Sequence, residues 1–150
     1  MIAYLKGKVL YQTDETLVLC VNGVGYEVFA SGSVFRRANE PEVEVYTYMQ
    51  VKEDGVALFG FSSLKEKELF IKLVSVSGVG PKMGIAVLSS LSADELAVAI
   101  QTADVKRLSS VKGLGKKTAE KIVLELHGKI SAEEILDAGG DFGAKAVQTE

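Results

Sequence analysis

The sequence contains one cysteine and one histidine among 150 residues, and these shortages exclude several kinds of site. A single cysteine cannot form an internal disulfide, and the apolar run around Cys20 predicts a place in the core. His127 has no cysteine or second histidine at metal-ligand spacing, so we expect no metal site. One histidine also leaves no Ser/His/Asp or Cys/His set, and we expect no catalytic residue and no cofactor.

Long apolar runs are also missing. No stretch approaches the ~20 apolar residues that span a bilayer, and the first residues do not have the pattern of a secretory signal. Together with the single cysteine, this favours a cytoplasmic protein with no membrane partner. The 47% of apolar residues is enough to build a compact core in one domain or two.

The net charge of −3 hides an uneven distribution along the chain. Residues 1–62 carry 5 Lys or Arg against 8 Asp or Glu, residues 63–130 carry 11 against 7, and residues 131–150 carry 1 against 5. Because binding depends on the local electric field, the middle segment is the candidate for an anionic partner.

Residues 1–62 have the composition and alternation of β-strands. Strands are expected at residues 3–11, 16–21, 25–29 and 43–49, and as a pair on either side of residues 52–55. Asn22-Gly23 predicts a tight turn between two of them. Five or so short strands joined by glycine turns predict a small closed barrel.

From Leu64 to Leu126 the apolar period becomes helical. Helices are expected to begin at Leu64, Gly84, Ala93, Thr102 and Thr118, the third behind a capping box of Ser92 and Glu95. The expected fold is α+β and multidomain, with a barrel at residues 1–62 and an all-α domain at residues 63–130. Residues 131–150 are small and polar and are expected to form a flexible linker.

A short motif occurs twice in the helical segment. Gly78-Val79-Gly80-Pro81-Lys82 returns 35 positions later as Gly113-Leu114-Gly115-Lys116-Lys117. Glycines let the backbone turn sharply, and the helix that follows presents free N–H groups and the positive end of its dipole. Two such places predict a polyanion bound at its phosphates, with DNA as the first candidate and no means of reading base edges. The alternative is two packing units whose glycines only make turns.

Other phosphate loops do not fit this motif. A Walker loop is excluded because its four-residue spacer and its Lys-Ser/Thr pair are missing, and a dinucleotide fingerprint lacks its third glycine and its preceding strand.

These residues resemble the helix-hairpin-helix DNA-binding motif, and the tandem pair behind a barrel resembles the RuvA family of Holliday-junction recognition subunits. The resemblance covers residues 1–130 and is carried by residues 1–7, 21–28, 58–61, 78–82 and 113–120. It implies an OB-fold barrel followed by two helix-hairpin-helix motifs. The phosphate contacts that it implies are those of Val79, Gly80, Lys82, Leu114, Gly115, Lys116, Lys117 and Thr118.

The resemblance also assigns an acidic pin to Glu53 and Asp54, between two strands of the barrel. Two carboxylates at a hairpin tip repel phosphates, so four copies would disfavour a continuous duplex and tolerate a junction whose strands separate. Without the resemblance, the same residues would be an ordinary solvated turn.

The resemblance further implies partners and an assembly. These are four-way junction DNA, a homotetramer or an octamer on DNA, the RuvB ATPase that performs branch migration, and the RuvC resolvase. In the family a third domain binds RuvB; this sequence ends at Glu150, so we expect junction binding from these residues and motor coupling to need that domain. The rival hypotheses are a helix-hairpin-helix glycosylase or lyase and an OB-type protein-interaction module.

Overall fold

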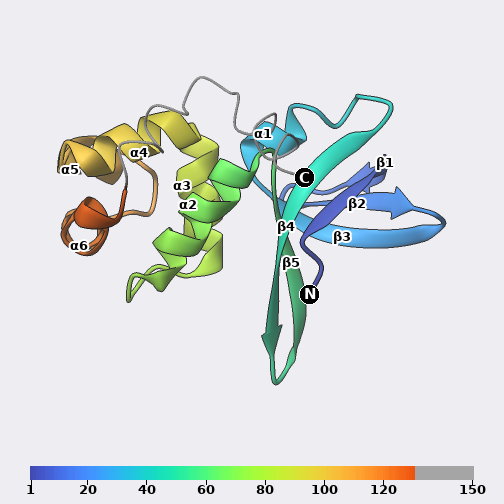
Figure 1. The fold of residues 1–150 in the computed structure, drawn as a ribbon, viewed down its shortest axis with the longest axis horizontal. Helices are drawn as coiled ribbons and strands as arrows, with labels where there is room; N and C mark the ends of the chain where they lie inside the picture. Colours follow the sequence, from blue (N-terminus) through green and yellow to red (C-terminus); the bar gives the residue numbers. More distant parts are fainter. Residues whose placement is uncertain (131–150) are drawn as a thin grey trace, which may run out of the picture. The chain divides into compact units, whose positions relative to one another are not determined.

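The computed structural model describes residues 1–130, and the linker expected at residues 131–150 lies outside them. The chain divides into two compact units, Met1–Ser63 and a second that begins at Leu64 (Figure 1). This division falls one residue after the boundary expected from the sequence.

The first unit is a closed five-stranded barrel, as the sequence predicts. Its strands follow one another around the barrel in the order β1-β2-β3-β5-β4, and all pairs are antiparallel except β3 with β5. The strands are β1 (Tyr4–Gln12), β2 (Thr16–Val21), β3 (Val24–Ala30), β4 (Val43–Lys52) and β5 (Gly55–Phe61).

Turn chemistry and alternation explain this barrel. Asn22 and Gly23 both have positive φ, the conformation that a two-residue turn between β2 and β3 requires. Leu17, Leu19 and Val28 are fully buried and form the core together with apolar residues of the other strands. The sequence predicts one strand at residues 43–49 and another before Lys52, whereas in the structure β4 is one strand that runs through both segments.

The described part of the second unit, residues 64–130, contains five helices. They are α2 (Leu64–Ser75), α3 (Pro81–Ser90), α4 (Ala93–Gln101), α5 (Val105–Ser109) and α6 (Lys116–Leu126), followed by the 3-10 turn η1 (His127–Lys129). The Ser92 hydroxyl accepts from the Glu95 N–H at 3.1 Å and the Glu95 carboxylate accepts from the Ser92 N–H at 2.9 Å, so the capping box is confirmed.

Several expectations differ from the structure. Helix α5 begins at Val105 rather than Thr102, because Asp104 is its N-cap and accepts from the Arg107 N–H. Helix α3 begins at Pro81 rather than Gly84, and α6 begins at Lys116 rather than Thr118, because Gly80 and Gly115 already serve as N-caps. The short helix α1 (Gly32–Phe35) was not expected. Cys20 is half-buried rather than in the core, since burial along β2 ends after its first four residues.

No single helix within residues 1–130 is long and apolar enough to cross a membrane. Helices α3 and α4 reach that length and composition only together, with a bend of 101° between them.

Candidate nucleic-acid interface

The two copies of the motif have the same backbone. In the first turn, residues 76–80, the Val79 N–H donates to the Val76 carbonyl at 3.0 Å. In the second turn, residues 111–115, the Leu114 N–H donates to the Val111 carbonyl at the same distance. Gly78 and Gly113, at φ of 92° and 89°, occupy the left-handed region that favours glycine. The repeat in the sequence is therefore a repeat in structure.

Each turn ends at the uncapped start of a helix. Gly80 and Gly115 are N-caps with extended backbone, and neither has a side chain to bond the first turn of α3 or α6. The first N–H groups of a helix have no intrahelical partner, and the helix dipole adds partial positive charge there. Because glycine leaves both caps open, an anion can approach these N–H groups closely.

Val79 and Leu114 contribute to the packing of the turns. Their side chains are only 5% and 4% exposed, and their N–H groups already donate within the turn. They hold each turn against the helices, and direct contact with a phosphate through them stays a prediction. Gly80, Gly115 and the residues that follow are the exposed part of each site.

The charges around the two turns differ. Lys82 is exposed in the first helix turn of α3, while Lys116 and Lys117 are exposed at the start of α6, with half-buried Thr118 behind them. The exposed Lys112 also lies in the second turn, where the first has Ser77. Sequence reasoning did not single out Lys112, although aligning the two copies would have shown this asymmetry.

The structure brings the two turns together. A Cβ built on Gly113 would lie 3.3 Å from the Cε of Met83, so the start of α3 borders the second turn. A partner that binds one turn therefore lies near the other.

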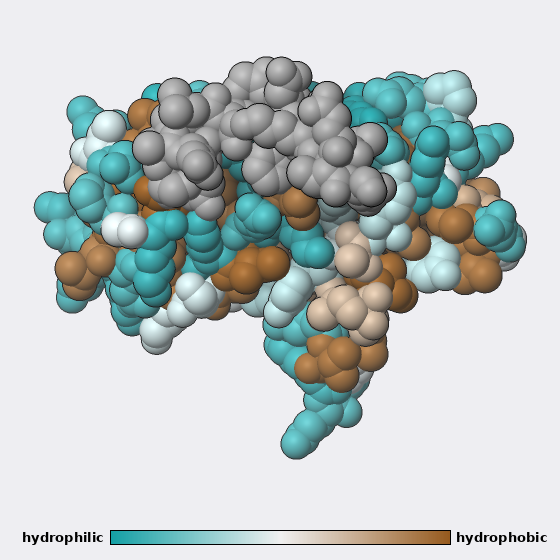
Figure 2. Space-filling model, viewed as in Figure 1, coloured by the Kyte–Doolittle hydropathy of each residue, from teal (hydrophilic) through white to brown (hydrophobic). Residues whose placement is uncertain are grey.

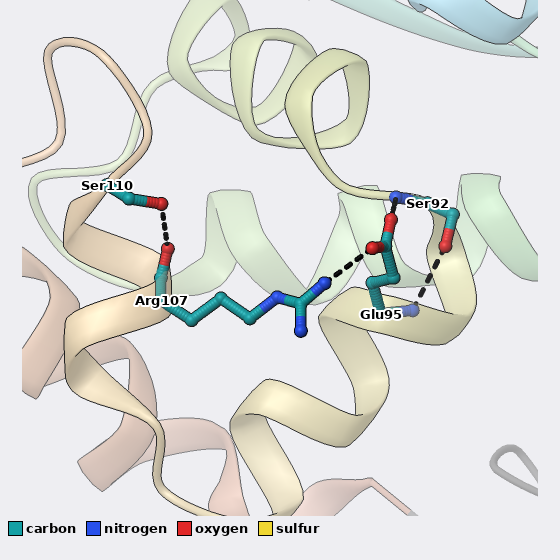
Figure 3. Close-up of polar contacts among 4 residues, drawn as sticks. All are labelled: Ser92, Glu95, Arg107 and Ser110. Atoms are coloured by element: carbon teal, nitrogen blue, oxygen red, sulfur yellow. Dashed lines mark hydrogen bonds and ion pairs between the residues drawn. The ribbon is translucent and has the colours of Figure 1, made fainter.

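The helices that enter the turns are also fixed alike. The Ser75 hydroxyl donates to the Lys72 carbonyl at 2.6 Å, and the Ser110 hydroxyl to the Arg107 carbonyl at 2.5 Å. Figure 3 shows the Arg107 side chain reaching from α5 to the Glu95 carboxylate at the start of α4. The hydrogen bonds from the Ser92 N–H and hydroxyl, followed by the Arg107 charge, lower the pKa of Glu95. Arg107 therefore ties the helix before the second turn to α4.

Glu53 and Asp54 lie in the first unit, at the tip of a long hairpin. Lys52 of β4 pairs with Gly55 of β5, which leaves Glu53 and Asp54 as the exposed two-residue turn. Figure 1 shows this β4–β5 hairpin projecting well beyond the rest of the barrel. Two carboxylates on a projecting tip form a local negative charge that a phosphate would avoid.

Comparisons with known proteins agree with this arrangement. Residues 1–60 match the family described as the RuvA N-terminal domain, and residues 70–129 match the SAM-like helix-hairpin-helix tandem. A protein of Acetivibrio thermocellus named Holliday junction branch migration complex subunit RuvA is 42% identical over 153 aligned positions, which cover 100% of this chain and 76% of that protein. The chain belongs to the RuvA family.

Other relatives of the same name give the same result. The protein of Neisseria meningitidis serogroup C is 45% identical over 154 positions, covering 100% of this chain and 77% of its own length. That of Chromobacterium violaceum is 41% identical over 152 positions, covering 100% and 77%. Membership of the RuvA family thus rests on both units.

Proposed function

We propose that this protein binds four-way DNA junctions by their structure and acts as the non-catalytic subunit of a branch-migration complex. The observation that carries the proposal is the pair of neighbouring turns, each of which leads into an uncapped helix N-terminus beside exposed lysines. This chemistry binds phosphates without reading sequence. The names of the relatives, which refer to a Holliday junction, support the same function.

Selection of a junction over a duplex needs a second device, and the β4–β5 hairpin supports one. In a homotetramer four acidic tips would meet at the centre, and two tetramers facing each other across the DNA would place four on each side. Glu53 and Asp54 of each copy would repel a duplex that crosses there and would accept an open, square junction whose strands turn away. The RuvB ATPase would then move the arms, and RuvC would cut the junction.

The test compares a synthetic four-way junction with a linear duplex of equal length in a mobility-shift titration. We expect preference for the junction, no nicking of either DNA, and a solution mass of four chains or eight on the junction. Equal weak binding to both DNAs would contradict junction recognition, and turnover on damaged duplex would favour a repair enzyme.

The acidic tip has its own test. The Glu53→Gln, Asp54→Asn variant should gain affinity for linear duplex more than for the junction, because repulsion of a continuous duplex is lost. Asp14→Asn with Glu15→Gln is the matched control, since it removes the same charge from another exposed turn of the same barrel. An unchanged ratio of duplex to junction affinity in the tip variant would remove the tip from the mechanism.

A further inference from the structure

The β4–β5 hairpin has an apolar face that its acidic tip does not explain. In an antiparallel pair, residues directly opposite each other share a face, and that face recurs every second residue. Met49 pairs with Leu58, and Val51 pairs with Val56, so these four side chains lie on one face. Leu58 belongs to the barrel core and Met49 packs against that core. The core stripe therefore continues out of the barrel along the hairpin.

Beyond the barrel nothing in the described residues covers this stripe. Val51 is 67% exposed and Val56 is 65% exposed. Val51 lies two residues before Glu53, and Val56 lies two residues after Asp54. Figure 2 shows hydrophobic surface next to the hydrophilic tip of this hairpin. The other face carries the pairs Lys52 with Gly55 and Gln50 with Ala57, which are polar or small. The hairpin is thus one-sided up to its tip.

The neighbouring charges restrict what can cover the two valines. A phosphate backbone on this face would lie beside the Glu53 and Asp54 carboxylates. Packing of a second copy on this face is the alternative, and the solution mass in the experiment below distinguishes it. A nucleobase has an apolar face and no charge, and at a branch point it has lost one stacking neighbour. Apolar side chains that enter a base stack in this way are a known means of unstacking DNA.

We infer that Val51 and Val56 contact the faces of nucleobases at the branch point of the junction and help to keep them unstacked. This inference rests on the proposed function and deepens it: the acidic tip keeps phosphates away while the valine pair receives the exposed bases. The hairpin then contributes attraction as well as repulsion at the place where strands part.

The experiment uses the full chain and an immobile four-way junction with 2-aminopurine at a branch-point base, or in the middle of one arm. This base analogue becomes more fluorescent when it unstacks. At saturating protein we expect a rise at the branch point and none in the arm. The Val51→Thr, Val56→Thr variant keeps side-chain shape and β-branching, and we expect it to bind the junction with the same salt dependence but to lose the rise. Val24→Thr is the matched control, an exposed valine beside another two-residue turn of the barrel.

Each other result overturns the inference in a distinguishable way. If the double variant binds the junction and gives the same rise as the unmodified chain, the valines do not contact bases. A bound junction with no rise for the unmodified chain likewise excludes base contact by the valines. A change in the solution mass of the DNA-free double variant would assign the valines to contacts between copies. Failure of the unmodified chain to prefer a junction would instead reject the proposed function, and the inference with it.

Discussion

The first turn, at residues 76–80, and the second turn, at residues 111–115, have matching hydrogen bonds and matching glycine conformations, yet different side chains stand on them. The position after the N-cap is Pro81 in one and Lys116 in the other. Proline fixes its φ and has no N–H, whereas lysine offers both an N–H and a charge. The second turn therefore offers an anion more donors on the same backbone.

The packing behind the turns differs in a compensating way. Gly84 of α3 and Ala119 of α6 occupy equivalent buried positions, four residues after their N-caps. Gly84 faces the ring of Phe70, while the residue 35 positions after Phe70 is the smaller Val105. In the first copy the large Phe70 ring lies against a residue with no side chain. In the second copy the two equivalent positions hold a valine and an alanine. The same turn geometry therefore occurs with different side chains at these helix positions, while both turns have glycine in the left-handed region.

The largest expected effect comes from breaking this compensation. A Cβ on Gly84 would lie 2.9 Å from two ring carbons of the fully buried Phe70, so the ring or the helices around it would have to shift. We expect Gly84→Ala to lower the free energy of unfolding by about 1–3 kcal/mol, as overpacking of a core does. Urea denaturation followed by circular dichroism measures this change.

The control for this prediction is the second copy. Ala119→Gly should cost about 1 kcal/mol from helix propensity, with no clash. Since Gly→Ala in a helix is ordinarily stabilising, a gain in stability from Gly84→Ala would show that α2 and α3 can separate without cost, and the contrast in packing between the two copies would not hold.

The second prediction concerns charge. Affinity for DNA falls with salt, and loss of a lysine that contacts a phosphate reduces the magnitude of the slope of log affinity against log salt by roughly one. Because the second turn carries the extra cation, we expect Lys116→Ala with Lys117→Ala to lower that slope by about twice as much as Lys82→Ala does. Mobility-shift titrations on one junction at several salt concentrations measure it.

Two controls sharpen this result. Lys8→Ala removes an exposed lysine from β1 of the barrel and should leave the slope nearly unchanged. Junctions of permuted sequence should lose affinity equally, since the turns are expected to contact phosphates only. A loss of affinity confined to some junction sequences would mean that one of the turns reads bases. An equal change in slope for the Lys82 variant and the Lys116, Lys117 variant would contradict the expected difference in phosphate contacts between the two turns.

Much of this comparison could be predicted from the sequence. The glycine spacing identified both turns, and the Ser92 and Glu95 pattern identified a helix start, because these signals depend on a few neighbouring residues. Alternation and the Asn22-Gly23 turn predicted the barrel for the same reason. Prediction from neighbouring residues works best where a glycine or a capping side chain determines the backbone conformation.

What could not be predicted depends on contacts between distant residues. Whether Cys20 enters the core depends on where the barrel ends, and the burial of Val79 and Leu114 depends on the helices around each turn. The adjacency of Met83 and Gly113 likewise follows only from the folded unit. The reach of the β4–β5 hairpin depends on one long strand that was expected as two.

The smallest expected effect concerns the link between α4 and α5 that Glu95 and Arg107 make. At the equivalent position before the first turn, Lys72 donates to the carbonyl of Lys129. The hydrogen bonds of Ser92 and the charge of Arg107 hold the pKa of Glu95 below its usual value. A lowered carboxyl pKa stabilises the fold above the unfolded pKa, and this stabilisation is lost as the pH falls through the folded pKa. Glu95→Gln should therefore lower the thermal midpoint at neutral pH, and the difference from the unmodified chain should vanish in acid.

Glu120→Gln provides the matched control, an exposed glutamate in the first turns of α6. Thermal melts of both variants between neutral and acidic pH separate the capping role of Glu95 from a general effect of removing one negative charge. If the loss of stability in Glu95→Gln is the same in acid, the glutamine destabilises α4 by its side-chain geometry. The ionised carboxylate is then not what holds α4 to α5. If the cost falls with pH while that of Glu120→Gln does not, the ionised Glu95 carboxylate stabilises α4, and loss of one negative charge in general does not explain the effect.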